Sequence, residues 1–324
     1  AISGSGPATV AAIGSLTIPA MIERGYDKYF AGALVAAAGC VGVMIPPSNP
    51  FVVYGVSAQV SIGDLFIGGI VPGILCGLVL MGYCYYRSRK EGWHGETRKR
   101  TAATVGKAFW DGKWALMVPI IVLGGIYGGF MTPTEAGAIA GLYALLVSFL
   151  IYRLMSWRTL KQVLVDTMKG TGSVSIMIGA ASAISFIFAK EQIGTILGNW
   201  LLSVTANKYV FLFAVNIIIL ILGCLVDTSV IQLVMIPILW PVAEAMGINI
   251  IHFGLIICFN MMVGLSTPPF GMCLFITSGI SGTPLKDIIR EIWWPIIVML
   301  IVLAVITYIP DVVLFLPKLT GMMA

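Results

Sequence analysis

The sequence predicts an all-α polytopic membrane protein, and three observations lead to that fold class. Hydrophobic residues make up 59% of the chain and charged residues only 10%, with a mean hydropathy of +0.99. A soluble domain carries about 25% charged residues, so this chain lacks the polar material for a water-exposed shell. Apolar runs of membrane-spanning length recur throughout, and a duplication of glycine and proline positions divides the chain into two halves.

The apolar runs are too long and too continuous for the alternating strands of a membrane barrel. A helix needs about 20 apolar residues to cross a hydrocarbon core of about 30 Å, and it satisfies its own backbone hydrogen bonds there. We therefore predict helices over the runs 64–86, 114–130, 136–155, 173–189, 208–226, 249–265 and 292–310.

The duplication keeps one constant offset along the chain. It pairs Pro19 with Pro241, Gly25 with Gly247, Gly42 with Gly264, Pro46 with Pro268 and Pro47 with Pro269. With a slip of one position, Asp64 pairs with Asp287 and Pro72 with Pro295. Because glycine and proline have the strongest backbone demands, chance accounts poorly for these matches. Two inverted repeats around a midplane site are typical of secondary carriers, and duplication without inversion stays open as the alternative.

Each half has a Pro-Pro pair inside an apolar segment, which predicts a broken helix. Pro47 and Pro269 lack an N–H, and their rings clash with the preceding turn. In hydrocarbon the freed carbonyls cost several kcal/mol each unless they line a cavity or bind something. Ser48 and Asn49 follow the first break and Gly271 the second, as a buried ion or solute site would require. A simple proline kink, relieved by neighbouring helices, is the alternative.

Asp227 separates the apolar runs 208–226 and 230–240. Together these runs are too short for two comfortable spans in sequence, so we predict a re-entrant helical hairpin with its tip near 227–229. By the duplication, residues 3–6 form the tip of a matching hairpin. A carboxylate inside a membrane segment is a functional candidate by default, and capping of the following helix is the alternative role.

Basic residues gather in two predicted loops, which the positive-inside rule places on the cytoplasmic side. The intervening stretch 114–152 is long enough for two helices that leave and return. The basic residues are Arg87, Arg89, Lys90, Arg98, Lys99, Arg100, Lys107 and Lys113 in the first loop, and Arg153, Arg158, Lys161 and Lys169 in the second.

Two further segments have local signatures. Residues 132–135 (TPTE) predict a capped helix start, with proline at the first helical position and Glu135 in a structural role. Residues 157–169 form an amphipathic stretch that suits the membrane interface.

The sequence shows no arrangement of residues that would support catalysis. The six cysteines stand singly in apolar stretches, and His94 and His252 lie far apart. A membrane enzyme would need a nucleophile with its base, or a set of metal ligands. A purely structural membrane subunit would not need two broken helices. We therefore predict no enzyme and no cofactor. The absence of a Walker motif leaves an ion gradient as the driving energy.

Five stretches together resemble the large membrane subunit of the TRAP (tripartite ATP-independent periplasmic) transporters, and they occur in the family's order. They are ISGSGPATVAAIG (2–14), GVMIPPSNPFVVYG (42–55), YGGFMTPTEAGAIA (127–140), LVDTSVIQLVMIPILWP (225–241) and VGLSTPPFGMCLF (263–275). The family's large subunit has further helices and a first hairpin arm before this point. Since the chain begins without an initiator methionine or a leader, we expect that N-terminal part to be missing.

The resemblance implies a sodium-coupled elevator-type importer of organic acids in the bacterial inner membrane. It implies two partners, a small membrane subunit that is separate or fused and a periplasmic substrate-binding protein. C4-dicarboxylates and sialic acids are family substrates, and the sequence resembles the sialic-acid branch most. The implied division is transport-domain parts at 1–63 and 173–287, scaffold helices with the basic loops at 64–172, and a C-terminal scaffold helix at 288–324.

The resemblance also implies the site residues. One sodium ion would be bound around Ser3, Gly4, Ser5, Ser48 and Asn49, and a second around Asp227, Thr228, Thr267, Pro269 and Gly271. The solute carboxylate would lie near Ser3, Ser5, Ser48 and Asn49. The alternative is another inverted-repeat carrier, driven by protons or exchanging divalent anions, that needs no binding protein.

Overall fold

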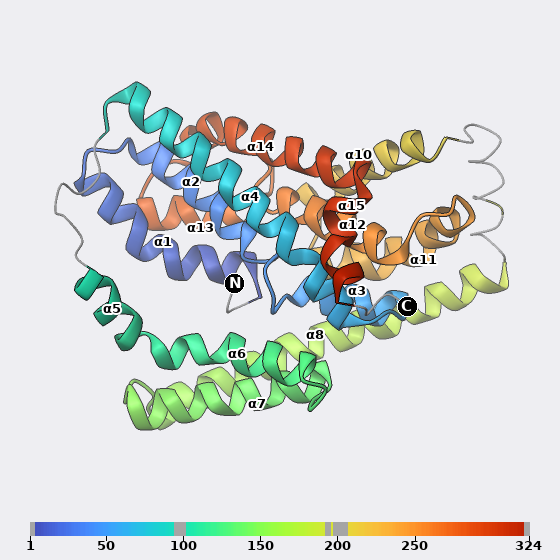
Figure 1. The fold of residues 1–324 in the computed structure, drawn as a ribbon, viewed down its shortest axis with the longest axis horizontal. Helices are drawn as coiled ribbons and strands as arrows, with labels where there is room; N and C mark the ends of the chain where they lie inside the picture. The colour runs from blue at the N-terminus through green and yellow to red at the C-terminus, as the bar shows by residue number, and fades with distance from the viewer. Residues whose placement is uncertain (1–3, 94–101, 192–195, 197–206, 321–324) are drawn as a thin grey trace. The chain divides into compact units, whose positions relative to one another are not determined.

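The computed structural model describes residues 4–93, 102–191, 196 and 207–320, and the regular secondary structure of these residues is helical (Figure 1). The chain divides into two compact units. Of the described residues, the first unit holds 4–93 and 184–320, and the second holds 102–183.

The first unit contains two sets of helices, one before and one after the second unit in the sequence. The first set is α1 (Gly6–Glu23), α2 (Lys28–Val41), α3 (Asn49–Ala58) and α4 (Ile62–Glu91). The second set is α10 (Lys208–Leu225), α11 (Thr228–Ala245), α12 (Ile250–Gly264), α13 (Met272–Ser281), α14 (Leu285–Tyr308) and α15 (Pro310–Leu319).

The helix boundaries repeat with the sequence duplication. Both ends of α1 recur in α11 at the offset that separates Pro19 from Pro241, as does the start of α2 in α12. The starts of α3 and α4 recur in α13 and α14 one position later. Gly25 and Gly247, which follow α1 and α11, both have positive φ, at 81° and 69°.

The caps repeat as well. Asp27 Oδ1 accepts hydrogen bonds from the N–H groups of Tyr29 and Phe30, at 2.9 and 2.8 Å. At the equivalent position, Asn249 Oδ1 accepts from Ile251 and His252, at 2.9 and 3.2 Å. Such a cap satisfies backbone donors that have no partner within the helix. The two halves therefore share local chemistry as well as proline and glycine positions.

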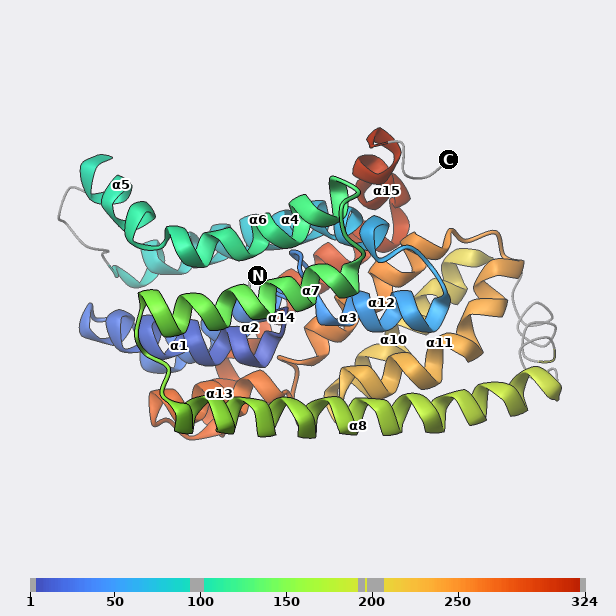
Figure 2. The same ribbon diagram turned by 90° about the horizontal axis from the view of Figure 1, so that it is seen from below.

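Packing between the halves is reciprocal. Helix α3 packs against α11, and its counterpart α13 packs against α1. Helix α2 packs against α14, and its counterpart α12 packs against α4. In Figures 1 and 2, α1 runs from the middle of this unit towards one end, and α11 runs from the middle towards the opposite end.

The two predicted helix breaks are confirmed. Helix α2 ends at Val41 and α3 begins at Asn49, while α12 ends at Gly264 and α13 begins at Met272. The Pro46–Pro47 and Pro268–Pro269 peptide bonds inside the breaks are both cis.

Five helical segments of the described residues are long and apolar enough to cross a membrane: 62–91, 133–151, 208–225, 228–245 and 285–308. One expectation is corrected here. The second hairpin arm, expected over 230–240, continues as α11 to Ala245, because Pro237 and Pro241 are accommodated inside the helix. Both arms therefore have 18 residues, and length alone does not distinguish a re-entrant hairpin from two full spans.

The second unit contains α5 (Ala102–Asp111), α6 (Lys113–Tyr127), α7 (Pro133–Leu146), a π-helical turn (Val147–Ile151) and α8 (Trp157–Lys190), whose last residues belong to the first unit. Helices α6 and α7 pack together around Val122, Ala136 and Ala140. The predicted cap is confirmed. Glu135 Oε2 accepts from the N–H of Thr132 at 2.8 Å, and Thr132 Oγ1 accepts from the N–H of Glu135 at 3.3 Å.

Helix α8 differs from expectation. The sequence predicts an interfacial stretch at 157–169 and a separate span at 173–189, whereas the structure joins them in one helix of 34 residues. Arg158, Lys161 and Lys169 consequently lie on a helix and not in a loop. In the other predicted loop, Lys107 lies in α5, and 98–100 fall outside the described residues.

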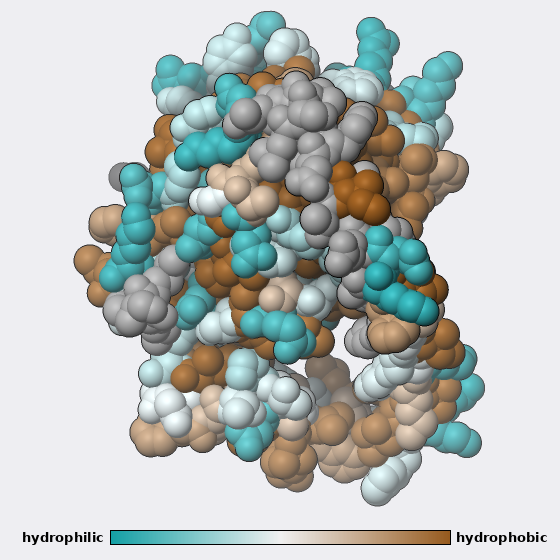
Figure 3. Space-filling model, turned by 90° about the vertical axis from the view of Figure 1, so that its right-hand side faces the viewer, coloured by the Kyte–Doolittle hydropathy of each residue, from teal (hydrophilic) through white to brown (hydrophobic). Residues whose placement is uncertain are grey.

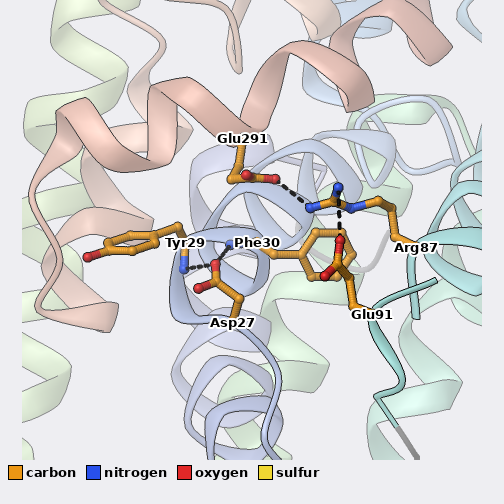
Figure 4. Close-up of polar contacts among 6 residues, drawn as sticks. All are labelled: Asp27, Tyr29, Phe30, Arg87, Glu91 and Glu291. Atoms are coloured by element: carbon orange, nitrogen blue, oxygen red, sulfur yellow. Dashed lines mark hydrogen bonds and ion pairs between the residues drawn. The ribbon is translucent and has the colours of Figure 1, made fainter. Parts of the chain in front are cut away.

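A polar cluster ties three helices together near the end of α4 (Figure 4). Arg87 of α4 pairs with Glu291 of α14 at 3.1 Å and with Glu91, one turn further along α4, at 3.4 Å. The Arg87 guanidinium also lies 5.7 Å from the ring centroid of Phe30 in α2. These contacts hold the charged end of Arg87 within the first unit, while its buried Nε has no hydrogen-bond partner among the described residues.

Large apolar side chains are exposed on many helices, and hydrophobic residues are prominent on the face drawn in Figure 3. On α10, for example, Phe213 and Ile221 are each 56% exposed. A soluble monomer rarely shows extended apolar surface, whereas a surface that faces lipid requires it.

Candidate functional site

The segment predicted as the first hairpin tip lies directly against the first helix break. The N–H of Asn49 donates a hydrogen bond to the carbonyl of Gly4 at 3.1 Å. Gly4 has φ +61°, and a Cβ added to it would lie only 2.9 Å from the carbonyl oxygen of Pro47. Only glycine combines this backbone conformation with so close an approach. We call the group Gly4, Ser5, Ser48 and Asn49 the first junction.

Three side chains of the first junction are described. Ser48 is 2% exposed, and its Oγ accepts from the N–H of Phe51 at 3.4 Å, at the start of α3. Ser5 is half-buried and occupies the N-cap position of α1, where its carbonyl accepts from the N–H and the hydroxyl of Thr9. Asn49 is exposed. Ser3, the remaining predicted residue of this group, lies outside the described residues.

The second break is closed by its own hydrogen bonds. The hydroxyls of Ser266 and Thr267 both donate to the carbonyl of Val263, at 3.0 and 2.7 Å, and the N–H of Cys273 donates to the carbonyl of Leu265 at 3.0 Å. A Cβ on Gly271 would lie 2.9 Å from the backbone of Thr267. The structure thus brings Thr267 and Gly271 together, while Pro269 is exposed.

Asp227 and Thr228 begin α11, at the predicted tip. Asp227 is exposed, and its Oδ1 accepts from the N–H of Ser229 at 2.9 Å, so the capping contact that the sequence offered as an alternative role is present. Among the described residues no hydrogen bond joins Asp227 to the second break. The end of α10 lies close to that break instead: a Cβ on Gly264 would lie 2.8 Å from the backbone of Gly223.

The two breaks are also neighbours. A Cβ on Gly6, at the start of α1, would lie 3.1 Å from Leu265 in the second break. Cys40, near the end of α2, contacts Cys273 at the start of α13, with 3.2 Å between their Sγ atoms. Sequence reasoning missed both contacts, because single apolar or thiol side chains carry no signal of a partner in the other half of the chain.

The helix ends at the first junction and at the second break offer two kinds of chemistry. Helices α1 and α11 begin at the predicted tips, and α3 and α13 begin at the breaks. Their N-cap residues are Ser5, Asp227, Ser48 and Gly271, in that order. Helix N-termini favour anions. Helices α2 and α12 end at the same breaks, where carbonyl oxygens and hydroxyls can coordinate a hard cation such as sodium. No group of three or more His, Cys, Asp or Glu side chains that could bind a metal ion occurs in the part of the chain that the structure describes.

Spanning helices, exposed apolar surface and paired helix breaks define a multi-pass α-helical membrane permease. The chain belongs to the family described as "Tripartite ATP-independent periplasmic transporter, DctM component", which it matches over residues 1–312. The family consists of transporter permeases, so the chain is not an enzyme, and the resemblance noted in the sequence is confirmed.

Three relatives illustrate the similarity. An isethionate TRAP transporter permease protein (DctMQ) of Oleidesulfovibrio alaskensis is 48% identical over 97% of this chain. A C4-dicarboxylate large permease protein (DctM) of Pseudomonas aeruginosa is 40% identical over 99%, and a sialic acid large permease protein (SiaM) of Vibrio cholerae is 35% identical over 98%. The chain spans 50% of the length of the first relative, 75% of the second and 74% of the third.

Proposed function

We propose that the protein imports a small organic anion across the bacterial inner membrane by sodium-coupled, elevator-type transport. The observation that carries this proposal is the first junction, where the tip at Gly4 is hydrogen-bonded to the break at Asn49. Irregular backbone at membrane depth is tolerated only where it is buried in protein or lines a cavity, and inverted-repeat carriers place their binding sites at such backbone. Both sides of this junction would supply it.

Sodium binding is supported by the oxygen atoms available at the junctions. At the second break, the Thr267 hydroxyl donates its hydrogen bond to the carbonyl of Val263, which leaves the oxygen lone pairs able to face a cation. Backbone carbonyls at the ends of α2 and α12 supply further neutral ligands. We propose one sodium ion around Ser3, Gly4, Ser5, Ser48 and Asn49, and a second around Asp227, Thr228, Thr267, Pro269 and Gly271.

The solute would face Ser3, Ser5, Ser48 and Asn49, near the N-termini of α1 and α3. The relative with 48% identity has isethionate in its name, and the relative with 40% identity has C4-dicarboxylate. Sialic acid is in the name of a relative with 35% identity. These values do not favour the sialic-acid branch. They support a small anion, and its acidic group can be a carboxylate or, as in isethionate, a sulfonate.

Elevator transport is supported by the reciprocal packing of the two halves and by the opposite directions of α1 and α11. We propose that the halves are inverted repeats, that α10 and α11 form a re-entrant hairpin, and that the parts at 1–63 and 173–287 move against the scaffold at 64–172 and 288–324. In inverted-repeat carriers, moving one bundle against the other exposes the site to each side in turn.

Two partners complete the proposal, a small membrane subunit and a periplasmic binding protein that delivers the solute. The names of the relatives and of the family support both partners, since "DctMQ" names a permease twice as long as this chain and "tripartite" describes the family.

The test is solute uptake by proteoliposomes that contain the full-length permease and its small subunit. Isethionate, a C4-dicarboxylate and a sialic acid would each be offered with its binding protein, under an inward sodium gradient. We expect uptake that requires sodium and a loaded binding protein and is abolished in Ser48→Ala. Uptake driven equally well by a proton gradient, or without a binding protein, would overturn the proposal.

A further inference from the structure

A groove of about 430 Å³ runs along the last turns of α4 in the first unit. Met81, Cys84, Tyr85 and Ser88 line it at intervals of three and four residues, so they share one face of the helix. The paired rings of Tyr26 and Trp93, 5.2 Å apart, complete the lining together with Arg89.

The groove changes character along its length. Met81 and Cys84 make one end apolar, whereas Ser88 and Arg89, about 6 to 12 Å further along the helix, make the other end polar and basic. Helix α4 is a candidate membrane span, and Tyr85 at 63% and Tyr86 at 64% exposure lie between these ends. Exposed aromatic rings followed by basic residues mark the place where a span leaves the hydrocarbon.

Arg89 differs from its neighbour Arg87. Arg87 is neutralised by Glu91 and Glu291, as Figure 4 shows. Arg89 lies 5.4 Å from the ring centroid of Tyr85, and the described residues provide no carboxylate that pairs with it or with Lys90. The polar end of the groove therefore carries positive charge that the described part of the protein does not balance.

We propose that this groove binds an anionic phospholipid. One acyl chain lies along Met81 and Cys84, and the phosphate contacts the Arg89 guanidinium and the Ser88 hydroxyl. A free anion would contact only the basic end. A phospholipid of the surrounding membrane contacts both ends, with its acyl chain at the apolar end and its headgroup at the basic end. The negative charge of the lipid matches the unbalanced charge of Arg89 and Lys90.

The first experiment is native mass spectrometry of the full chain in detergent, titrated with phosphatidylglycerol or with phosphatidylcholine of the same acyl chains. We expect phosphatidylglycerol to bind more tightly. Arg89→Gln should weaken its binding about five-fold, since one basic side chain near a lipid surface contributes about 1 kcal/mol. Arg89→Lys should retain most of the affinity. Arg290→Gln, which removes the same charge from an exposed position on α14, should leave it unchanged.

Cys84 provides a second readout that locates the lipid. It is half-buried, whereas the other five cysteines are buried. Phosphatidylglycerol should therefore slow maleimide labelling of Cys84, and inorganic phosphate should not. Equal binding of the two lipids, equal effects of Arg89→Gln and Arg290→Gln, or protection of Cys84 by phosphate alone would each overturn the proposal.

Discussion

The N–H of Asn49 donates a hydrogen bond to the carbonyl of Gly4 across 3.1 Å, joining the start of α3 to the chain just before α1. The contact links the predicted hairpin tip to a helix break that follows two complete helices later in the sequence. It also sets the spacing of the first junction, because Gly4 lies against the carbonyl of Pro47 as well.

Replacing Gly4 by alanine should disrupt the first junction. Alanine must adopt φ +61° and place its Cβ 2.9 Å from the Pro47 oxygen. Gly25→Ala is the matched control, since Gly25 has φ +81° but no atom within 4 Å of an added Cβ. We expect Gly25→Ala to cost about 1 kcal/mol of stability and keep sodium-dependent uptake, while Gly4→Ala loses uptake. Equal uptake by the two variants would contradict this role for the junction.

Two substitutions separate the role of the Asp227 charge from the role of its capping hydrogen bond. Asp227→Asn keeps a side-chain acceptor for the N–H of Ser229, whereas Asp227→Ala removes it and should cost about 1 kcal/mol. If the carboxylate serves the proposed second sodium site, both variants should need more sodium for half-maximal uptake, although only the alanine variant is less stable. A normal sodium requirement in Asp227→Asn would leave Asp227 with the structural role alone.

A polar network buried in the second half should contribute to stability. Asn260 Nδ2 donates to the carbonyl and the Oδ1 of Asn216, at 2.8 and 2.9 Å, and Asn216 Nδ2 donates to Thr307 Oγ1 at 3.0 Å. Asn260→Leu should cost about 1 kcal/mol, measured by thermal unfolding in detergent. In a double-mutant cycle with Thr307→Val the two effects should not add, because both act through Asn216. Strict additivity would show that the network does not act as a unit.

The contact between Cys40 and Cys273 gives a direct test of how the breaks are arranged. Their sulfur atoms are 3.2 Å apart although the residues are 233 positions apart in the sequence. The membrane-permeant oxidant diamide should convert this pair of thiols to a disulfide while itself being reduced to a hydrazine. Peptide mass spectrometry should detect the 40–273 crosslink before any other. A dominant crosslink between other cysteines would contradict the packing of α2 against α13.

The ion pair between Arg87 and Glu291 should matter more than the pair between Lys318 and Asp311. The first has side chains only 20% and 27% exposed, and the second has side chains 56% and 82% exposed. Glu291→Gln should cost about 1–2 kcal/mol in thermal unfolding, and Asp311→Asn much less. A hydrogen bond and the charge of Lys318 hold the pKa of Asp311 below its usual range. The small contribution of Asp311 is thus present near neutral pH and is lost as the pH falls through that lowered pKa.

The sequence predicted the features that rest on backbone chemistry. The offset from Pro19 to Pro241 anticipated the matching of α1 with α11, and the Pro-Pro pairs anticipated both breaks. Hydropathy placed α4 and α14, but it could not predict that α11 continues to Ala245, because a proline at 241 indicates a helix end and the helix accommodates it. Contacts between distant apolar groups, such as Gly6 with Leu265, also remained invisible, because they depend on how the two halves pack.

The unbroken length of α8 has a mechanical consequence. At 1.5 Å per residue its 34 residues extend about 50 Å, against a hydrocarbon thickness of about 30 Å. With the predicted span 173–189 seated in the bilayer, the charged segment 157–169 forms a stiff overhang of about 20 Å. If such a helix tilts about the middle of the predicted span 173–189, each residue is displaced in proportion to its distance from that pivot. Trp157, at the far end of the overhang, therefore moves several times more than the last turn inside the lipid.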